Sequence, residues 1–334
     1  MSTADALPGA RPAPVLEAND LVKHFPVRVR GRSRTVQALN GVSLTVRQGA
    51  CVGLVGESGC GKTTAGRLLV GIDDPTSGTV LLEGNPVHRP GRRTATATRR
   101  RIQMVFQDPQ ASLDPRMTAA QSVGEPLRVS GVSRRETAVR VSALLLRVGL
   151  DDEVGRRRPA ALSGGQRQRV GIARALALDP AVVVADEPTS ALDVSVRAQV
   201  INLLRDLQRE LSLGMVFISH DLSTVRYLCD EVAVMYLGRI VEQGPTEQVF
   251  DAPAHPYTRA LLDAVLVPDP VVEQARREPT LSGDLPDPSA PPSGCAFRTR
   301  CPEAQDICAQ ERPLLLTTGD DRLAACHFAR ADVS

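Results

Sequence analysis

Short apolar runs alternate with longer segments of helical periodicity along most of this chain. Apolar runs bounded by turn or polar residues predict buried strands at 51–55, 102–106, 182–185, 215–219 and 231–235. Helical periodicity predicts helices at 62–71, 119–129, 134–148, 195–211 and 222–229. Two earlier segments, 15–25 and 36–46, also have strand character and flank a basic loop at 28–34. Strands that alternate with helices in this way predict an α/β fold with a largely parallel sheet covered on both faces.

The pattern divides the chain into three parts. Residues 1–14 are rich in Ala and Pro and lack the apolar core of a signal peptide, so we expect a flexible N-terminal tail. Residues 15–251 hold the alternating pattern, and the helices within about 108–178 predict an inserted helical subdomain. In the remainder, 252–334, a stretch at 268–294 dense in Pro, Asp and Ser predicts irregular chain that leads to four of the seven cysteines.

Composition excludes few classes of protein. The 334 residues are 42% hydrophobic and 23% charged, values ordinary for a soluble globular protein. A net charge of +2 gives no basic attraction toward nucleic acid, and no nucleic-acid partner is expected. No apolar stretch approaches the ~20 residues that a bilayer requires, so a role at a membrane would come through a partner.

A glycine-rich motif follows the predicted strand at 51–55. It fits the phosphate-loop (Walker A) pattern GxxxxGK[ST] and consists of Gly56, Glu57, Ser58, Gly59, Cys60, Gly61, Lys62 and Thr63. Its glycines allow successive backbone N–H groups to face an anion, and the following helix adds its positive end. We expect Lys62 to reach the β- and γ-phosphates and Thr63 to offer its hydroxyl to Mg²⁺, with Thr64 beside them. The motif predicts binding of a nucleoside triphosphate.

An acidic pair closes the predicted strand at 182–185. Asp186 would stand at the carboxyl edge of the sheet, beside the bound phosphates, where a carboxylate can hold Mg²⁺ directly or through water. Glu187, one residue further on, points differently and can polarise the attacking water as a general base. The pair therefore predicts hydrolysis as well as binding.

A third motif, Leu162-Ser163-Gly164-Gly165-Gln166, lies between the phosphate loop and the acidic pair. In this order it resembles the signature of the ATP-binding cassette (ABC) ATPases. The resemblance implies an ABC nucleotide-binding domain with a RecA-like parallel core, an antiparallel β subdomain and a helical subdomain. The serine and glycines would open a helix at 166–178 whose first N–H groups attract an anion. This end lies too far along the fold to reach its own phosphate loop, and the resemblance implies that it closes over ATP held by a second ATPase.

The same resemblance assigns four further positions. Gln107 matches the family's Q-loop glutamine, which would contact Mg²⁺ or the water, and His220 matches the switch histidine at the γ-phosphate. Asp193 ends a stretch from Pro188 that matches the D-loop. Phe25 aligns with the aromatic residue that stacks on adenine; a phenylalanine of the core is the alternative.

Segments 255–261 and 291–302 resemble the C-terminal extension of oligopeptide/dipeptide importer ATPases, and 56–62 and 107–116 resemble the "F" member of their ATPase pair. This implies an ATPase that energises uptake of di- and oligopeptides at the cytoplasmic face of the membrane. The implied partners are a second, distinct ATPase, two permeases and an extracytoplasmic solute-binding protein. Import of nickel or another solute remains an alternative, because the cassette does not touch the cargo. A soluble ABC ATPase acting outside transport would show two cassettes or a basic surface.

Four cysteines, Cys295, Cys301, Cys308 and Cys326, lie in the Pro-rich tail, separated by five, six and seventeen residues. In a cytosolic chain such a cluster favours metal ligands over disulfides. The spacing lacks the CxxC pairs usual for zinc, and some members of the resembled family carry a four-iron, four-sulfur cluster at matching cysteines. Free thiols, zinc, disulfides and a ligand role for His327 remain open.

Overall fold

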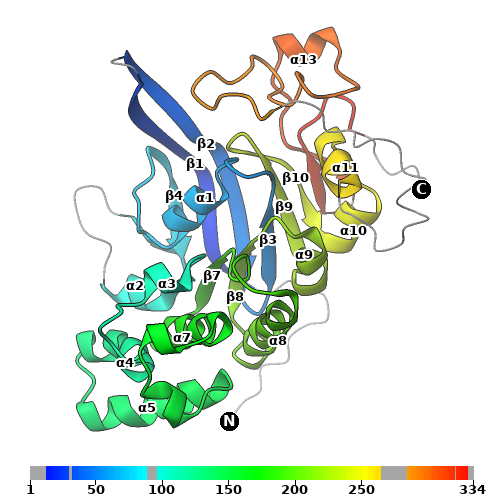
Figure 1. Ribbon diagram of the computed structural model, residues 1–334. Helices are drawn as coiled ribbons and strands as arrows, with labels where there is room; N and C mark the ends of the chain where they lie inside the picture. Colours follow the sequence, from blue (N-terminus) through cyan, green and yellow to red (C-terminus); the bar gives the residue numbers. More distant parts are fainter. Residues whose placement is uncertain (1–12, 30–31, 89–95, 265–283, 320, 330–334) are drawn as a thin grey trace.

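The computed structural model describes residues 13–29, 32–88, 96–264, 284–319 and 321–329. Two sheets organise this part of the chain (Figure 1). The larger has the strand order β11-β12-β10-β9-β3-β8-β7-β6, and the smaller has the order β2-β1-β4-β5. The predicted N-terminal tail lies almost wholly outside the described residues.

Five parallel strands form the core of the larger sheet. They are β3 (Cys51–Val55), β6 (Ile102–Val105), β7 (Val182–Asp186), β8 (Gly214–Ile218) and β9 (Glu231–Tyr236). Every residue of β3, β7 and β8 is buried, as expected for strands covered on both faces. The predicted strands and the α/β class are confirmed, and each strand end lies within one residue of its prediction.

The smaller sheet is antiparallel and corrects one prediction. It contains β1 (Pro14–Val29), β2 (Arg32–Arg47), β4 (Ser77–Leu82) and β5 (Asn85–Pro86). The predicted basic loop at 28–34 is largely strand, because β1 and β2 pair as far as Val29 and Arg32. The pattern analysis missed β4, whose first half is exposed and polar.

Helices form a separate layer and also cover the core sheet (Figure 1). The layer holds α3 (Pro109–Ser112), α4 (Ala119–Val129), α5 (Arg134–Arg147), α6 (Asp152–Gly155) and α7 (Gly164–Leu176). Near the parallel strands run α1 (Lys62–Leu69), α8 (Val194–Glu210) and α9 (Leu222–Leu228), and the short α2 (Thr96–Arg101) leads into β6. The predicted helices are confirmed, although α7 begins two residues early because Ser163 caps it.

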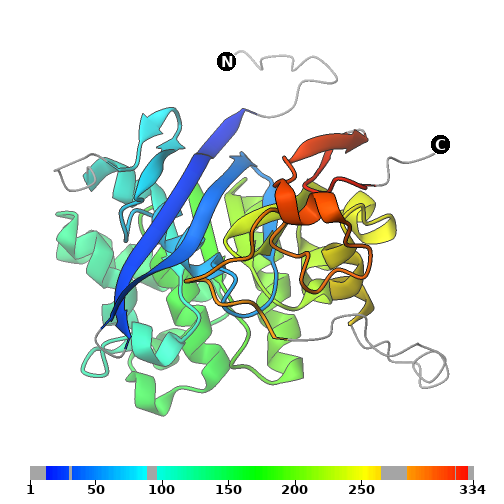
Figure 2. The same ribbon diagram turned by 90° about the horizontal axis from the view of Figure 1, so that it is seen from above.

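The C-terminal part joins the core sheet instead of standing apart. Strand β10 (Arg239–Pro245) pairs antiparallel with β9 on one side and with β12 (Arg322–Ala324) on the other, and β11 (Leu316–Gly319) completes the edge. Helices α10 (Thr246–Asp251), α11 (Pro256–Asp263) and α13 (Asp306–Gln310) pack nearby (Figure 2). As predicted, residues 284–294 contain neither helix nor strand; the rest of that stretch, up to residue 283, lies outside the described residues.

Among the described residues, no helix combines the length and the apolar character needed to cross a membrane.

Candidate functional site

A cleft of about 620 Å³ opens beside the phosphate loop. It collects residues from the smaller sheet, the phosphate loop and the ends of β6, β7 and β8. The lining consists of Phe25, Val36, Ala38, Ser58, Gly59, Gly61, Lys62, Thr63, Thr64, Gln107, Glu187, His220 and Pro288. Most of the residues predicted to bind ATP therefore share one cavity, although they are separated by up to nearly two hundred positions in the sequence.

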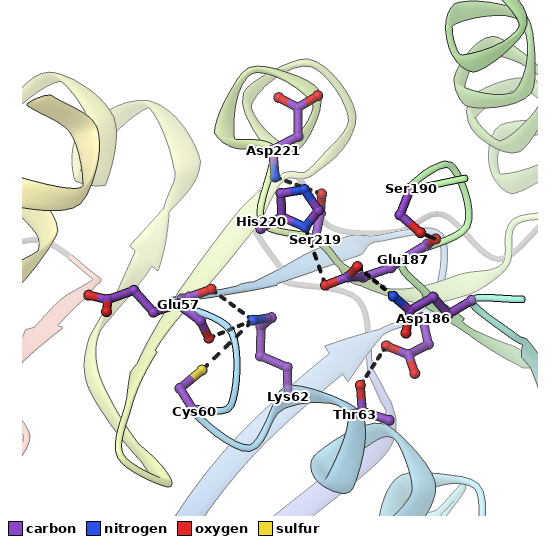
Figure 3. Close-up of polar contacts among 12 residues, drawn as sticks. Glu57, Cys60, Lys62, Thr63, Asp186, Glu187, Ser190, Ser219, His220 and Asp221 are labelled. Carbon is purple, nitrogen blue, oxygen red and sulfur yellow. Dashed lines mark hydrogen bonds and ion pairs between the residues drawn. The ribbon is translucent and has the colours of Figure 1, made fainter. Parts of the chain in front are cut away.

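The phosphate loop needs its glycines for steric reasons. Gly56 and Gly61 both have positive φ, and a Cβ at either position would collide with a backbone carbonyl, that of Met235 or of Ala38. Lys62 is buried, and its Nζ donates to the carbonyl oxygens of Gly56 at 2.7 Å and Glu57 at 3.0 Å (Figure 3). The carbonyl groups of the loop thus bind the Lys62 ammonium group, which the sequence analysis predicts to contact the phosphates.

Two of the three predicted Mg²⁺ ligands lie side by side. The Thr63 hydroxyl donates to Oδ1 of Asp186 at 3.2 Å, which brings two hard oxygen donors together next to the phosphate loop (Figure 3). Burial raises the pKa of the Asp186 carboxyl, the Thr63 hydrogen bond opposes that rise, and the charge of Glu187 adds to it. A cation at this position would offset the cost of burying the charge, so the donor set fits Mg²⁺.

Gln107, the third predicted ligand, binds Glu187. Its Nε2 donates to Oε2 of Glu187 at 3.0 Å, and Nδ1 of His220 lies 3.3 Å from the other carboxylate oxygen, Oε1 (Figure 3 shows the imidazole and the carboxylate). Glu187 has φ 42°, and its N–H donates to Ile218 on the adjacent strand. This backbone turn sends the Glu187 side chain into the cleft while that of Asp186 faces Thr63. Three residues predicted separately therefore meet at one carboxylate.

The signature residues lie outside this cleft. Ser163 caps α7: its hydroxyl accepts from the Gln166 N–H at 3.2 Å, and the Gln166 side chain accepts from the Ser163 N–H at 3.0 Å. Asp193 similarly caps α8 by accepting from the Val196 N–H at 3.0 Å. Neither residue lines the chain's own cleft, and nor do Gly164 and Gly165. Their predicted contact with a partner's ATP stays a prediction.

Phe25 lies at the cleft, half-buried, and not in the core. The Lys23 ammonium sits 4.9 Å from the centre of its ring, which places a cation over the aromatic ring. The adenine contact stays a prediction.

Sequence reasoning missed the contacts between the C-terminal part and the phosphate loop. Arg300 binds the Glu57 carboxylate, the Tyr257 hydroxyl accepts from the Glu57 N–H, and Pro288 lines the cleft. Tyr257 and Arg300 fall inside the segments quoted for the family resemblance, but nothing in their spacing connects them to a loop 200 or more positions away.

The four tail cysteines line one cavity of about 10 Å³, together with His255 and His327. Burial raises the pKa of the Cys301 thiol to about 11 and raises those of Cys295 and Cys326. Within the described ranges, no three His, Cys, Asp or Glu side chains are arranged to hold a metal ion. The cavity has room for about one water molecule, so a cluster would require these thiols to move apart.

The parallel core, the phosphate loop, the acidic pair after β7 and the capped signature helix define an ATP-binding cassette ATPase. Comparison with known proteins agrees: residues 39–190 match the "ABC transporter" family, and residues 241–308 match "Oligopeptide/dipeptide transporter, C-terminal region". The oligopeptide transport ATP-binding protein OppF of Escherichia coli (strain K12) is 48% identical over 90% of this chain and 92% of its own. The "Probable peptide ABC transporter ATP-binding protein y4tS" of Sinorhizobium fredii is 50% identical over 94% and 89%.

Solved structures show the same fold. A dimeric ATP-binding cassette in a post-hydrolysis state, bound to ADP and phosphate, matches with a TM-score of 0.62 and 29% identity over 69% of this chain and 98% of that one. The cbiO1 protein from Clostridium perfringens matches with a TM-score of 0.62 and 30% identity over 72% and 91%. The chain belongs to the family of ATP-binding subunits of oligopeptide/dipeptide ABC transporters.

Proposed function

We propose that this chain hydrolyses ATP in the cleft beside its phosphate loop, with Glu187 as general base, and that hydrolysis drives peptide import. The observation that carries the proposal is the meeting of Gln107, Glu187 and His220 opposite Lys62 in one cavity. In this arrangement the Glu187 carboxylate takes a proton from water as the water oxygen attacks the γ-phosphorus, and ADP leaves with the bridging oxygen. Gln107 and His220 orient that carboxylate and the γ-phosphate.

Lys62 supplies a fixed positive charge to the β- and γ-phosphates, and the N–H groups of the loop bind their oxygens. Thr63 and Asp186 would hold Mg²⁺, with Gln107 as the third predicted ligand, and the ion would neutralise charge on the phosphates. Phe25 would stack on the adenine ring.

Two variants separate the base from the phosphate binder. Glu187→Gln should keep nucleotide affinity and lose turnover by about 10²-fold or more, because an amide cannot accept the proton. Lys62→Ala should lose affinity as well, because its ammonium contacts the ground-state phosphates. Measured MgATP affinity and ATPase rate distinguish them, and a Glu187→Gln protein that turns over at the wild-type rate would remove Glu187 from this role.

The second half of each site comes from another subunit. The chain has one phosphate loop and one signature, and Ser163 to Gln166 lie outside its own cleft. The solved structure with bound ADP and phosphate is dimeric, which supports pairing of this chain with a second ATPase. We propose a heterodimer with a related ATPase, in which Asp193 and the signature contact the partner's nucleotide.

A second cavity is suited to a permease. It measures about 930 Å³, lies between the core sheet and the helical layer, and is lined by the exposed side chains of Ile72 and Phe106. Thr63 and Gln107 line both this cavity and the nucleotide cleft, so a segment docked here would contact residues of the nucleotide site. We propose that a permease segment docks here, in a complex with two permeases at the cytoplasmic face of the membrane.

The names of the relatives support peptides as cargo over nickel, delivered by an extracytoplasmic solute-binding protein. Because the cassette does not meet the cargo, none of its described residues selects it.

The cysteine cavity supports a finer proposal. Cys295, Cys301, Cys308 and Cys326 come from three segments and line one cavity, so a four-iron, four-sulfur cluster could be held there once the thiols move into a ligating arrangement. Zinc and free thiols are the other outcomes. Anaerobic purification followed by visible absorbance, metal analysis and sulfide assay decides among them. A colourless, metal-free protein whose four thiols react with a thiol reagent while it is folded would exclude the cluster.

A further inference from the structure

The C-terminal extension, residues 252–334, contacts the phosphate loop of its own chain through Glu57. Glu57 occupies the second position of the loop, yet in Figure 3 its carboxylate points away from Lys62 and Thr63. Its partner is Arg300, which lies 243 positions further along the chain. The phosphate loop and the extension are thus joined at a residue whose side chain points away from Lys62 and Thr63.

The contact is an ion pair in which one guanidinium nitrogen donates to both carboxylate oxygens. Nη1 of Arg300 donates to Oε1 and Oε2 of Glu57, both at 3.0 Å. The Arg300 side chain is 7% exposed and that of Glu57 25%, so solvent screens the pair little. A charge-assisted pair with this geometry fixes the orientation of the carboxylate as well as its charge.

Tyr257 holds the backbone of the same loop residue. Its hydroxyl accepts a hydrogen bond from the Glu57 N–H at 3.0 Å. The ring is fully buried and packs against Tyr236 and Phe297, with ring centres 4.7 Å and 5.3 Å away. Phe297 lies between Cys295 and Arg300 in sequence, so this aromatic cluster connects the loop to the cysteine-lined part of the extension.

A third contact lies at the mouth of the cleft. The N–H of Gln37, on β2, donates to the carbonyl of Pro288 at 3.1 Å, and Arg34 pairs with Asp287 at 3.4 Å. Pro288 itself lines the nucleotide cleft. The extension therefore lines part of the cleft through Pro288, in addition to contacting the phosphate loop.

We propose that Arg300 and Tyr257 are positioning residues that hold the phosphate loop in its anion-binding conformation, so that the C-terminal extension sets the chain's affinity for MgATP. The proposal rests on nucleotide binding at this loop. An unpaired carboxylate at position 57 would stand next to the phosphates and repel them, and it would compete with them for Lys62. Arg300 neutralises that charge and turns it away, while the Tyr257 hydroxyl accepts from the Glu57 N–H.

The test measures MgADP affinity by calorimetry and KM and kcat for MgATP on the full chain. Arg300→Gln should weaken MgADP binding about tenfold and raise KM by a similar factor, with kcat at saturation nearly unchanged. Arg300→Lys should recover part of the affinity, since it restores the charge without the planar guanidinium group. Tyr257→Phe, which keeps the packed ring, should lose affinity in the same direction and carries the test if Arg300→Gln does not fold.

Arg259→Gln is the matched control. It removes an ion pair with Glu303 that also lies within the extension but does not touch the loop. This variant should bind MgADP like the wild type. Adding Glu57→Gln to Arg300→Gln should recover part of the lost affinity, because it removes the unpaired carboxylate that repels the phosphates.

The outcomes distinguish failure of the positioning role from failure of nucleotide binding itself. If Arg300→Gln and Tyr257→Phe both bind MgADP with wild-type affinity, the extension only stabilises the fold and the inference is wrong. If the wild type itself binds no MgADP, the proposed function fails instead.

Discussion

Asp186 is a charged residue that weakens the fold. Burial raises the pKa of its carboxyl, against the hydrogen bond from Thr63 and with a further rise from Glu187. The Asp186 carboxyl therefore binds its proton more tightly in the folded protein than in the unfolded chain. Ionisation of Asp186 near neutral pH therefore lowers the free energy of unfolding. This loss of stability disappears as the pH falls through the raised pKa of Asp186. Such a carboxylate is retained for binding a cation, not for stability.

Asp186→Asn tests this reasoning. The amide oxygen can still accept from Thr63 but carries no charge, so Tm of the nucleotide-free protein should rise by about 2 °C at pH 8. The rise should be smaller at pH 5, where the wild-type carboxyl is closer to its neutral form. Mg²⁺-dependent ATPase activity should be lost. Thermal unfolding at both pH values and an ATPase assay provide the measurements; a drop in Tm at pH 8 would contradict the assignment.

At the scale of the element, helix α7 presents its N-terminus to solvent with a complete capping box. The Ser163 and Gln166 side chains each accept from the other's N–H group, which leaves the N–H groups of Gly164 and Gly165 without an intrahelical partner. Helix α5 offers a comparison in the same layer, since Ser133 caps it by accepting from the Glu136 N–H. Ser163 is predicted to contact ATP in another subunit as well as to cap α7, whereas Ser133 only caps α5.

Ser163→Ala and Ser133→Ala should each lower the free energy of unfolding by about 1 kcal/mol, because each removes one cap. Only Ser163→Ala should also reduce partner-stimulated ATPase activity, by about tenfold or more. Chemical denaturation and ATPase assays with the partner present measure the two effects. Equal ATPase rates in the two variants would show that α7 has no role at the partner's site.

At the scale of the whole molecule, the nucleotide cleft and the larger cavity share Thr63 and Gln107. Isolated chain should be mainly monomeric with weak ATPase activity, and partner ATPase and permeases should increase that activity. Ile72→Asp, at a position 45% exposed in the larger cavity, should lose the permease-dependent increase and keep MgATP affinity.

Val139→Asp is its control, at a position 67% exposed on α5 outside both cavities, and it should respond to permeases like the wild type. Light scattering and ATPase assays with and without the partners provide the measurements. Full activity from a monomer, at any protein concentration, would contradict the shared-site model.

The sequence alone determined the parallel core and most of the nucleotide site. Strands β3, β7 and β8 are continuous apolar runs because both of their faces are buried, and such runs are visible in a window of a few residues. The phosphate loop and the acidic pair are equally local, since their chemistry needs particular residues next to one another. Gln107 and His220 followed from the family resemblance, and the structure brings both to Glu187.

Tertiary structure decided what depends on distant segments. Two features leave no periodic or spacing signal because each joins residues far apart in the chain. They are the pairing of β10 with β12 and the contacts of Arg300 and Tyr257 with Glu57. The β1–β2 hairpin replaced the predicted basic loop because strand pairing with a neighbour outweighs local charge. Local pattern reports which face of an element is buried, and only packing determines what lies against it.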